Sequence, residues 1–179
     1  MTFTIQNPEA DPVIAKQATD AFDLLTPHWR ELLPPITAII VNERFDRIAD
    51  LRPMIDARFS NWGDHEWEQV YAFSPKYSLN EAEVWLRPYY SFDSFAREVY
   101  CLLAQIVWTT TPDIRAEVAA ATHKSFHTAN AALLYFSVSF GRFFLNRKLL
   151  RERNLAAWFL MERLDDLVET KQLQRLQVT

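Results

Sequence analysis

One apolar stretch decides the fold, Phe95-Ala-Arg-Glu-Val-Tyr-Cys-Leu-Leu-Ala-Gln-Ile-Val-Trp108. It predicts a helix with Asp93 or Ser94 as the capping residue. Helices and three short strands precede it, and helical segments follow it to the end of the chain. This order predicts an α+β, helix-dominated single domain with a small sheet of about three strands in the middle and long C-terminal helices.

Helix-start signals and other local patterns on either side of this helix divide the 179 residues into regions. Asp11-Pro12 and Thr26-Pro27 each place a capping side chain before a proline at the first helical position, so each predicts the start of a helix. The predicted regions are a flexible N-terminus at 1–10, helices at 12–33, a small sheet region at 36–87 and a helical region at 94–179.

Three segments are predicted as strands. Residues 36–42 are rich in β-branched residues and follow two prolines, and residues 81–87 alternate between apolar and polar side chains. Residues 66–73 alternate more weakly and predict the third strand. In the 81–87 strand, the alternation puts Trp85 on the face opposite the apolar residues.

The composition argues against several classes of enzyme. Only two glycines occur, Gly63 and Gly141, which is too few for a loop that holds nucleotide phosphates. No cofactor is expected. The single cysteine, Cys101, lies among apolar neighbours and is expected to be a small buried residue rather than a nucleophile.

Neither a signal peptide nor a membrane-spanning segment is expected, and the expected location is the cytoplasm. Residues 1–100 carry a formal charge of −7 and residues 101–179 a charge of +3. An imbalance of this size does not by itself indicate nucleic-acid binding.

The order of elements resembles that of the SprT-like zincin metallopeptidases. In that family a strand ending in an Asn-Glu/Arg phrase follows the first helix, and two further strands lead into a helix carrying His-Glu-x-x-His. A third ligand comes from a later His followed by a Phe. The matching phrases lie within about residues 12–135 and are Ile40-Val-Asn-Glu-Arg44, Val84-Trp-Leu86, the 95–108 helix and His123-Lys-Ser-Phe126. The resemblance concerns order alone, because no specific motif is intact.

The metal site that this resemblance implies is degenerate. The first ligand would fall on Cys101, the catalytic base on Leu102 and the second ligand on Gln105, and only the third ligand, on His123, is an imidazole. One imidazole cannot hold a tetrahedral zinc ion, and leucine cannot deprotonate a water molecule. The resemblance therefore implies a pseudoenzyme.

A different metal site would use His123 and His127, which are four residues apart and share one face of a helix. Such a pair needs a further ligand, for which the candidates are Glu98, Asp113 and Glu117. A polar stripe on a helix explains the pair without a metal, and we favour that interpretation. Asp64-His65-Glu66 predicts a polar loop.

A basic segment follows in the C-terminal part, with five cations in twelve residues: Arg142, Arg147, Lys148, Arg151 and Arg153. Phe140, Phe143 and Phe144 lie alongside. Cations interleaved with aromatic rings can hold a single nucleic-acid strand through phosphate contacts and base stacking. A solvated basic helix that pairs with acidic residues elsewhere is the favoured interpretation.

The aromatic residues before the 95–108 helix are candidate anchors for a protein partner: Trp85, Tyr89, Tyr90 and Phe92, with Trp62 and Trp67 as further members. Exposed tryptophan and tyrosine are typical of binding surfaces. A helix that covers this face is an equally good explanation.

These observations predict a non-enzymatic interaction or structural protein, which binds another protein or a second copy of itself through aromatic surface and the C-terminal helices. One alternative is a nucleic-acid-associated module that uses the basic segment. The other is a metal-dependent hydrolase that uses His123 and His127.

Overall fold

The computed structural model describes the backbone of residues 2–88, 91–122, 125–126 and 128–178, and the side chains of these residues except 58, 92 and 172–178. The chain opens with β1 (Phe3–Gln6), α1 (Pro12–Asp23), α2 (Pro27–Leu32) and β2 (Ile36–Ile40). Both predicted helix starts are confirmed. The Asp11 side chain accepts hydrogen bonds of 3.0 Å from the backbone N–H groups of Val13 and Ile14, as an N-cap residue does.

The prediction of a flexible N-terminus at 1–10 was wrong. β1 pairs in parallel with β2, and the ring of Phe3 stacks on that of Phe22 with centroids 4.6 Å apart. A strand whose partner is distant along the chain leaves only a short local pattern, which is why the sequence did not reveal it.

Short helices fill the middle of the chain before the last two strands. They are the 3₁₀ turns η1 (Phe45–Arg47) and η2 (Ala49–Leu51), then α3 (Arg52–Arg58) and α4 (Asp64–Glu68), followed by β3 (Ala72–Tyr77) and β4 (Ala82–Leu86). The predicted strand at 66–73 and the predicted loop at 64–66 were therefore wrong. Glu66 accepts a hydrogen bond of 2.9 Å from the backbone N–H of Gly63, a capping interaction that favours a helix at this point.

The strands form one sheet in the order β1-β2-β4-β3, in which β1, β2 and β4 are parallel and β3 is an antiparallel edge strand. The predicted strands at 36–42 and 81–87 are confirmed, and β1 raises the total from the expected three to four. Alternate residues of β2 and β4 are buried on one face: Ile36, Ala38, Ile40, Ala82, Val84 and Leu86.

The second half of the chain is helical, as predicted, and consists of α5 (Phe92–Thr110), α6 (Pro112–Thr122), α7 (Ala129–Arg153) and α8 (Leu155–Val178). Ser91, rather than Asp93 or Ser94, caps α5. Asn146 interrupts α7 with φ −156° and ψ 74°. Its side chain accepts a hydrogen bond of 2.9 Å from the backbone N–H of Leu149, which starts the second part of the helix.

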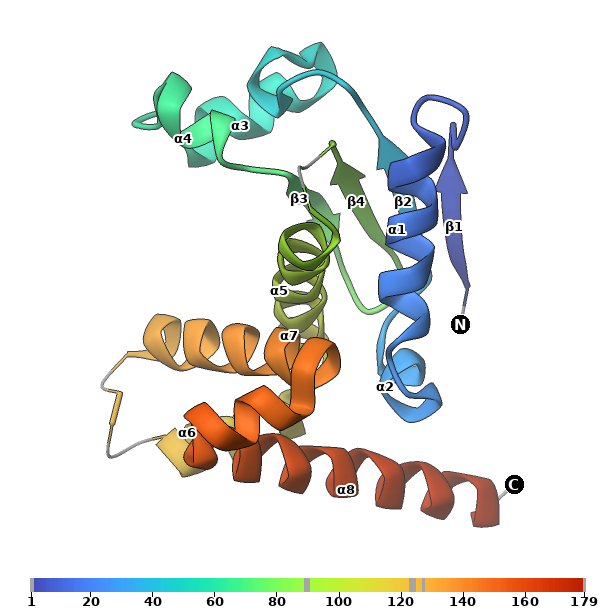
Figure 1. Ribbon diagram of the computed structural model, residues 1–179, viewed down its shortest axis with the longest axis vertical. Coiled ribbons are helices and arrows are strands. Elements are labelled where there is room, and N and C mark those ends of the chain that lie inside the picture. The colour runs from blue at the N-terminus through green and yellow to red at the C-terminus, as the bar shows by residue number, and fades with distance from the viewer. Residues whose placement is uncertain (1, 89–90, 123–124, 127, 179) are drawn as a thin grey trace.

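Figure 1 shows the sheet and α1 on one side of the molecule, α6, α7 and α8 on the other, and α5 running between them. α5 contacts α1, β3, α6 and α7. It crosses α7 at Gly141, where an added Cβ would lie 3.4 Å from Cβ of Tyr100. A glycine at this crossing lets the two helix backbones approach closely.

The main core lies between the sheet and the helices and contains the fully buried rings of Trp29, Tyr100, Phe136 and Phe140. The hydroxyl of Tyr100 donates a hydrogen bond of 2.6 Å to the carbonyl of Ala21, which ties α5 to α1. Burial of this hydroxyl raises its pKa. A smaller cluster of Phe45, Leu51, Ile55 and Trp67 lies beneath the short helices.

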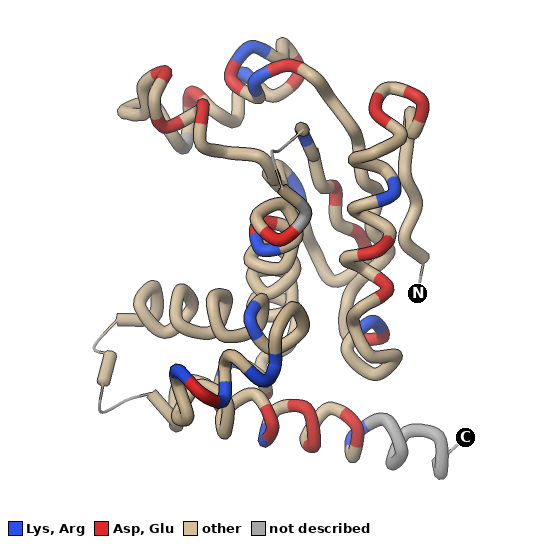
Figure 2. The backbone as a smooth tube through the Cα atoms, in the orientation of Figure 1, with Lys and Arg blue, Asp and Glu red and all other residues tan. Residues whose placement is uncertain are grey.

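Figure 2 shows that cations gather on the second part of α7, and acidic residues lie along the neighbouring α8. None of the described helices is long and apolar enough to cross a lipid bilayer.

Candidate functional site

A cleft of about 330 Å³ lies between β3 and α5. Its walls come from three parts of the chain: Phe59, Trp62 and Val70 before β3; Ala72, Phe73, Ser74 and Tyr77 on β3; and Glu98, Cys101, Leu102 and Gln105 on α5. Small-molecule and peptide side-chain sites are usually concave, mostly apolar and of this volume, so the cleft is the first candidate for a binding site.

The residues that α5 contributes recur at spacings of three and four, so they share one face of the helix. They include Cys101, Leu102 and Gln105, the positions onto which the zincin resemblance carries the first ligand, the base and the second ligand. The window that we singled out in the sequence therefore faces a cleft.

Partial desolvation raises the pKa of both titratable groups on this wall, the half-buried Cys101 and the exposed Glu98. It raises the pKa of the Cys101 thiol to about 11, with a smaller contribution from the nearby carboxylate of Glu98. The thiol also donates a weak hydrogen bond to the carbonyl of Ser137, with a sulfur–oxygen distance of 3.9 Å. Desolvation raises the pKa of Glu98 as well, against an opposing effect of Arg97.

These side chains do not fit a zinc ion. Zinc takes thiolate, neutral imidazole or carboxylate ligands, and of the three positions carried over by the resemblance only Cys101 can supply one, because Leu102 and Gln105 offer neither charge nor imidazole. Among the described residues, no three His, Cys, Asp or Glu side chains are grouped to hold a metal.

His123 and His127 lie outside the described residues. Two of the further ligands suggested for them are occupied elsewhere. Asp113 forms an ion pair with Lys171, and Glu117 forms one of 2.7 Å with Arg163.

The half-buried thiol of Cys101 leads to a first prediction. The rate at which Cys101 reacts with iodoacetamide should be about tenfold lower at pH 8 than that of a solvent-exposed cysteine, because the loss of thiolate outweighs the gain in its nucleophilicity. The rate should also keep rising about tenfold per pH unit up to pH 10, where an ordinary thiol levels off near pH 9. Mass spectrometry of the alkylated protein measures both, and a plateau near pH 9 would contradict the raised pKa of the thiol.

The predicted aromatic anchors do not form one surface. Trp62 is 38% exposed, and its ring centroid lies 4.7 Å from that of Phe59 and 5.0 Å from that of Trp67. Trp67, proposed as its neighbour on the surface, is only 3% exposed because it belongs to the smaller core. The prediction that Trp67 is an exposed anchor was therefore wrong.

Trp85 lies on the predicted face of β4, opposite the buried residues, but it is half-buried against the smaller core. Its indole N–H donates a hydrogen bond of 2.6 Å to Glu83. Short helices thus cover this face, as the alternative interpretation held. Tyr89 and Tyr90 lie outside the described residues, as does the side chain of Phe92.

Sequence reasoning missed Phe59, Phe73 and Tyr77, which supply the aromatic wall of the cleft. The signal that would have found Phe73 and Tyr77 is the alternation of β3, which we placed too early in the chain. Phe59 follows α3 in a segment without a clear pattern, so only the tertiary structure brings it to the cleft.

The basic segment does not have the arrangement that binds single-stranded nucleic acid. Its neighbouring phenylalanines face the core: Phe140 is 0% and Phe143 is 3% exposed, and Phe144 packs against them. They cannot stack on bases, and that part of the alternative was wrong.

Three of the five cations have partners within the protein. Arg147 pairs with Glu162 and Asp165, Lys148 pairs with Glu152, and the guanidinium of Arg151 lies 4.9 Å from the ring centroid of Trp158. The segment therefore mostly pairs with acidic or aromatic side chains of the same chain, which is the interpretation that we favoured. Arg142 and Arg153 differ, because they line a separate pocket.

No model of a known protein family matches this chain, and no curated protein sequence matches it either.

Proposed function

We propose that this protein is a non-enzymatic binding protein that holds an apolar side chain of a partner protein in the cleft between β3 and α5. The observation that carries the proposal is the chemistry of the cleft: Trp62 is 38% exposed beside Phe59 and Phe73, and the facing wall of α5 offers Cys101, Leu102 and Gln105, with Glu98 as its one carboxylate. Aromatic residues in a concave, water-excluding setting are typical anchors for a partner's side chain.

The same cleft supports a pseudoenzyme on a zincin-like scaffold. What supports it is that α1, α2 and β2 precede β3, β4 and α5, although β1 and the four short helices η1, η2, α3 and α4 are additional to the order that the resemblance implies. The positions onto which the resemblance carries a metal site line the cleft, and they present a thiol, a leucine and a glutamine. A scaffold of this kind keeps a place for a peptide without the groups that activate water.

A partner of different sequence suits this cleft better than a second copy of the chain. A two-fold symmetric dimer needs a patch that is complementary to itself. A concave cleft is instead filled by a side chain that protrudes from another surface.

The test is a screen of displayed random peptides against the purified protein. We expect enriched peptides to carry a large apolar residue and to bind about tenfold or more weakly to Trp62→Ala and to Gln105→Lys, which adds a charge to the cleft. Phe159→Ala is the matched control, because this aromatic side chain is 58% exposed on α8, away from the cleft. Fluorescence titration measures the dissociation constants, and circular dichroism checks folding.

Two outcomes would contradict the proposal. One is a set of peptides that bind Trp62→Ala as tightly as the unmodified protein. The other is peptidase activity that persists through purification and chelation, since a binding protein with this cleft chemistry has no means of hydrolysis.

A further inference from the structure

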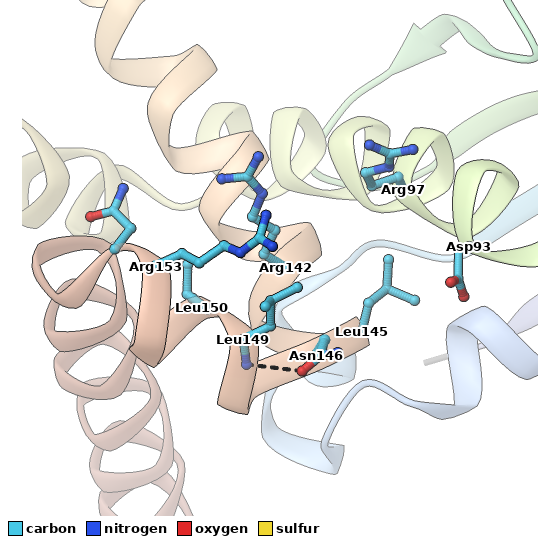
Figure 3. A pocket seen from close by; sticks show the side chains of 9 residues that line it. Asp93, Arg97, Arg142, Leu145, Asn146, Leu149, Leu150 and Arg153 are labelled. Atoms are coloured by element: carbon cyan, nitrogen blue, oxygen red, sulfur yellow. Dashed lines mark hydrogen bonds between the residues drawn. The ribbon is translucent and has the colours of Figure 1, made fainter.

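A second pocket, of about 370 Å³, lies where α7 bends, and its lining differs entirely from that of the cleft. Figure 3 shows it between α5 and the two parts of α7. The bend at Asn146 turns the second part of α7 back, so that Arg142 before the bend and Arg153 after it line one cavity. Arg97 of α5 joins them.

The crossing at Gly141 brings these helices together. An added Cβ there would lie 3.9 Å from Cγ of Arg97, so the residue next to Arg142 packs directly on the residue that supplies the third guanidinium. The pocket thus depends on two local features of the sequence, a glycine at the crossing and an asparagine at the bend.

None of the three arginines forms a direct ion pair in the described part of the chain, although the charge of Arg97 acts to lower the pKa of the neighbouring Glu98. The one hydrogen bond of their guanidinium groups there runs from Arg97 to the hydroxyl of Ser94, at 3.2 Å. Asp93, the one acidic residue of the lining, leaves the pocket with a net charge of +2. Within the basic segment, the residues that have partners are Arg147, Lys148 and Arg151, and none of these three lines the pocket.

We propose that this pocket binds a small organic phosphate monoester, with its phosphate held by Arg97, Arg142 and Arg153 and its apolar part resting on Leu145 and Leu149. Arginine presents a planar set of donors that matches phosphate oxygens in pairs. A dianion neutralises the excess charge of the pocket, and the leucines offer a surface that inorganic phosphate would leave uncovered.

A polymer is a poorer match to the same residues. Nucleic acid is bound along a continuous track of cations, but the cations that would extend this pocket into a track are paired with Glu152, Glu162 and Asp165. The volume falls in the range of small-molecule sites, about 300 to 1,000 Å³. A soluble metabolite and a lipid headgroup can both present the phosphate monoester.

Isothermal titration with phenyl phosphate tests the site. We expect a dissociation constant below about 1 mM at low salt, weakened about tenfold by Arg142→Gln and by Arg153→Gln, and less by Arg142→Lys, which keeps the charge but loses the paired contact. Arg151→Gln is the matched control, because this arginine is exposed on the same helix and lies over Trp158 instead of in the pocket. The substituted side chains are exposed, so the melting temperature should not change.

Vesicles containing phosphatidic acid distinguish the two sources of the ligand. Binding to these vesicles that is lost in Arg142→Gln assigns the phosphate to a lipid, and binding to phenyl phosphate alone assigns it to a soluble compound; either result supports the site. Absence of binding to both probes would overturn it. So would equal loss of affinity in Arg151→Gln, or tighter binding of a single-stranded oligonucleotide that depends on all five cations.

Discussion

Phe140→Ala should lower the free energy of unfolding by about 4 kcal/mol, the largest effect that we expect of any single substitution. The ring is 0% exposed and lies against those of Trp29, Phe136 and Phe144, with centroids 5.2, 5.6 and 4.9 Å away. Removing it leaves a cavity among rigid rings, which relax little, so both the transfer energy and the cavity term are lost. Urea denaturation followed by circular dichroism measures the difference.

Phe159→Ala provides the control for this experiment, since the same truncation at a 58% exposed position of α8 should cost less than about 1 kcal/mol. The comparison also tests whether the phenylalanines beside the basic segment belong to the core. If Phe140→Ala cost no more than Phe159→Ala, the ring would be accessible, and base stacking would again be possible.

Asp165→Ala should cost about 3 kcal/mol, because this carboxylate satisfies a buried donor. One oxygen, Oδ1, accepts a hydrogen bond of 2.7 Å from the indole N–H of Trp29, and Nε2 of His28 lies 2.7 Å from the same atom. Trp29 is fully buried. An alanine would leave its N–H group without an acceptor inside the protein, which costs more than a hydrogen bond contributes when both partners are present.

Asp165→Asn is the matched variant, because its amide oxygen can still accept the indole N–H at almost the same size. We expect it to recover more than half of the lost stability. The unfolding midpoint in urea measures both variants. If Asp165→Ala and Asp165→Asn both lowered the unfolding midpoint only slightly, the contact between α2 and α8 would contribute little to the stability of the fold.

Local signals account for most of the helices that were predicted correctly. The Asp11 side chain caps α1, and Pro27 marks the start of α2, although the Thr26 side chain makes no capping hydrogen bond. Residues 36–42 and 81–87 carry strong strand patterns. β1 and β3 were missed or misplaced because their positions depend on pairing with strands elsewhere. A short apolar pattern does not by itself distinguish a strand from a helix.

The candidate sites were predictable to the extent that they depend on helical spacing. Residues 98, 101, 102 and 105 share a face of α5, as helical spacing predicts, but the cleft that they line was not predicted because its other walls come from β3 and the segment before it. The same reasoning, applied to Phe136, Phe140 and Phe143, would have assigned them to a buried stripe. The pocket at Arg142 could not be predicted, because it depends on the bend at Asn146 and on the crossing with α5.

The contact between His28 and Asp165 joins residues that are 137 positions apart. A ribosome must therefore have released most of the chain before α2 can meet α8. Until then Trp29 lacks the acceptor that its indole N–H finds in the native protein, and the N-terminal unit is left incomplete during synthesis. Because contacts between distant parts of a chain carry a large loop-closure cost, we expect this one to form late in folding.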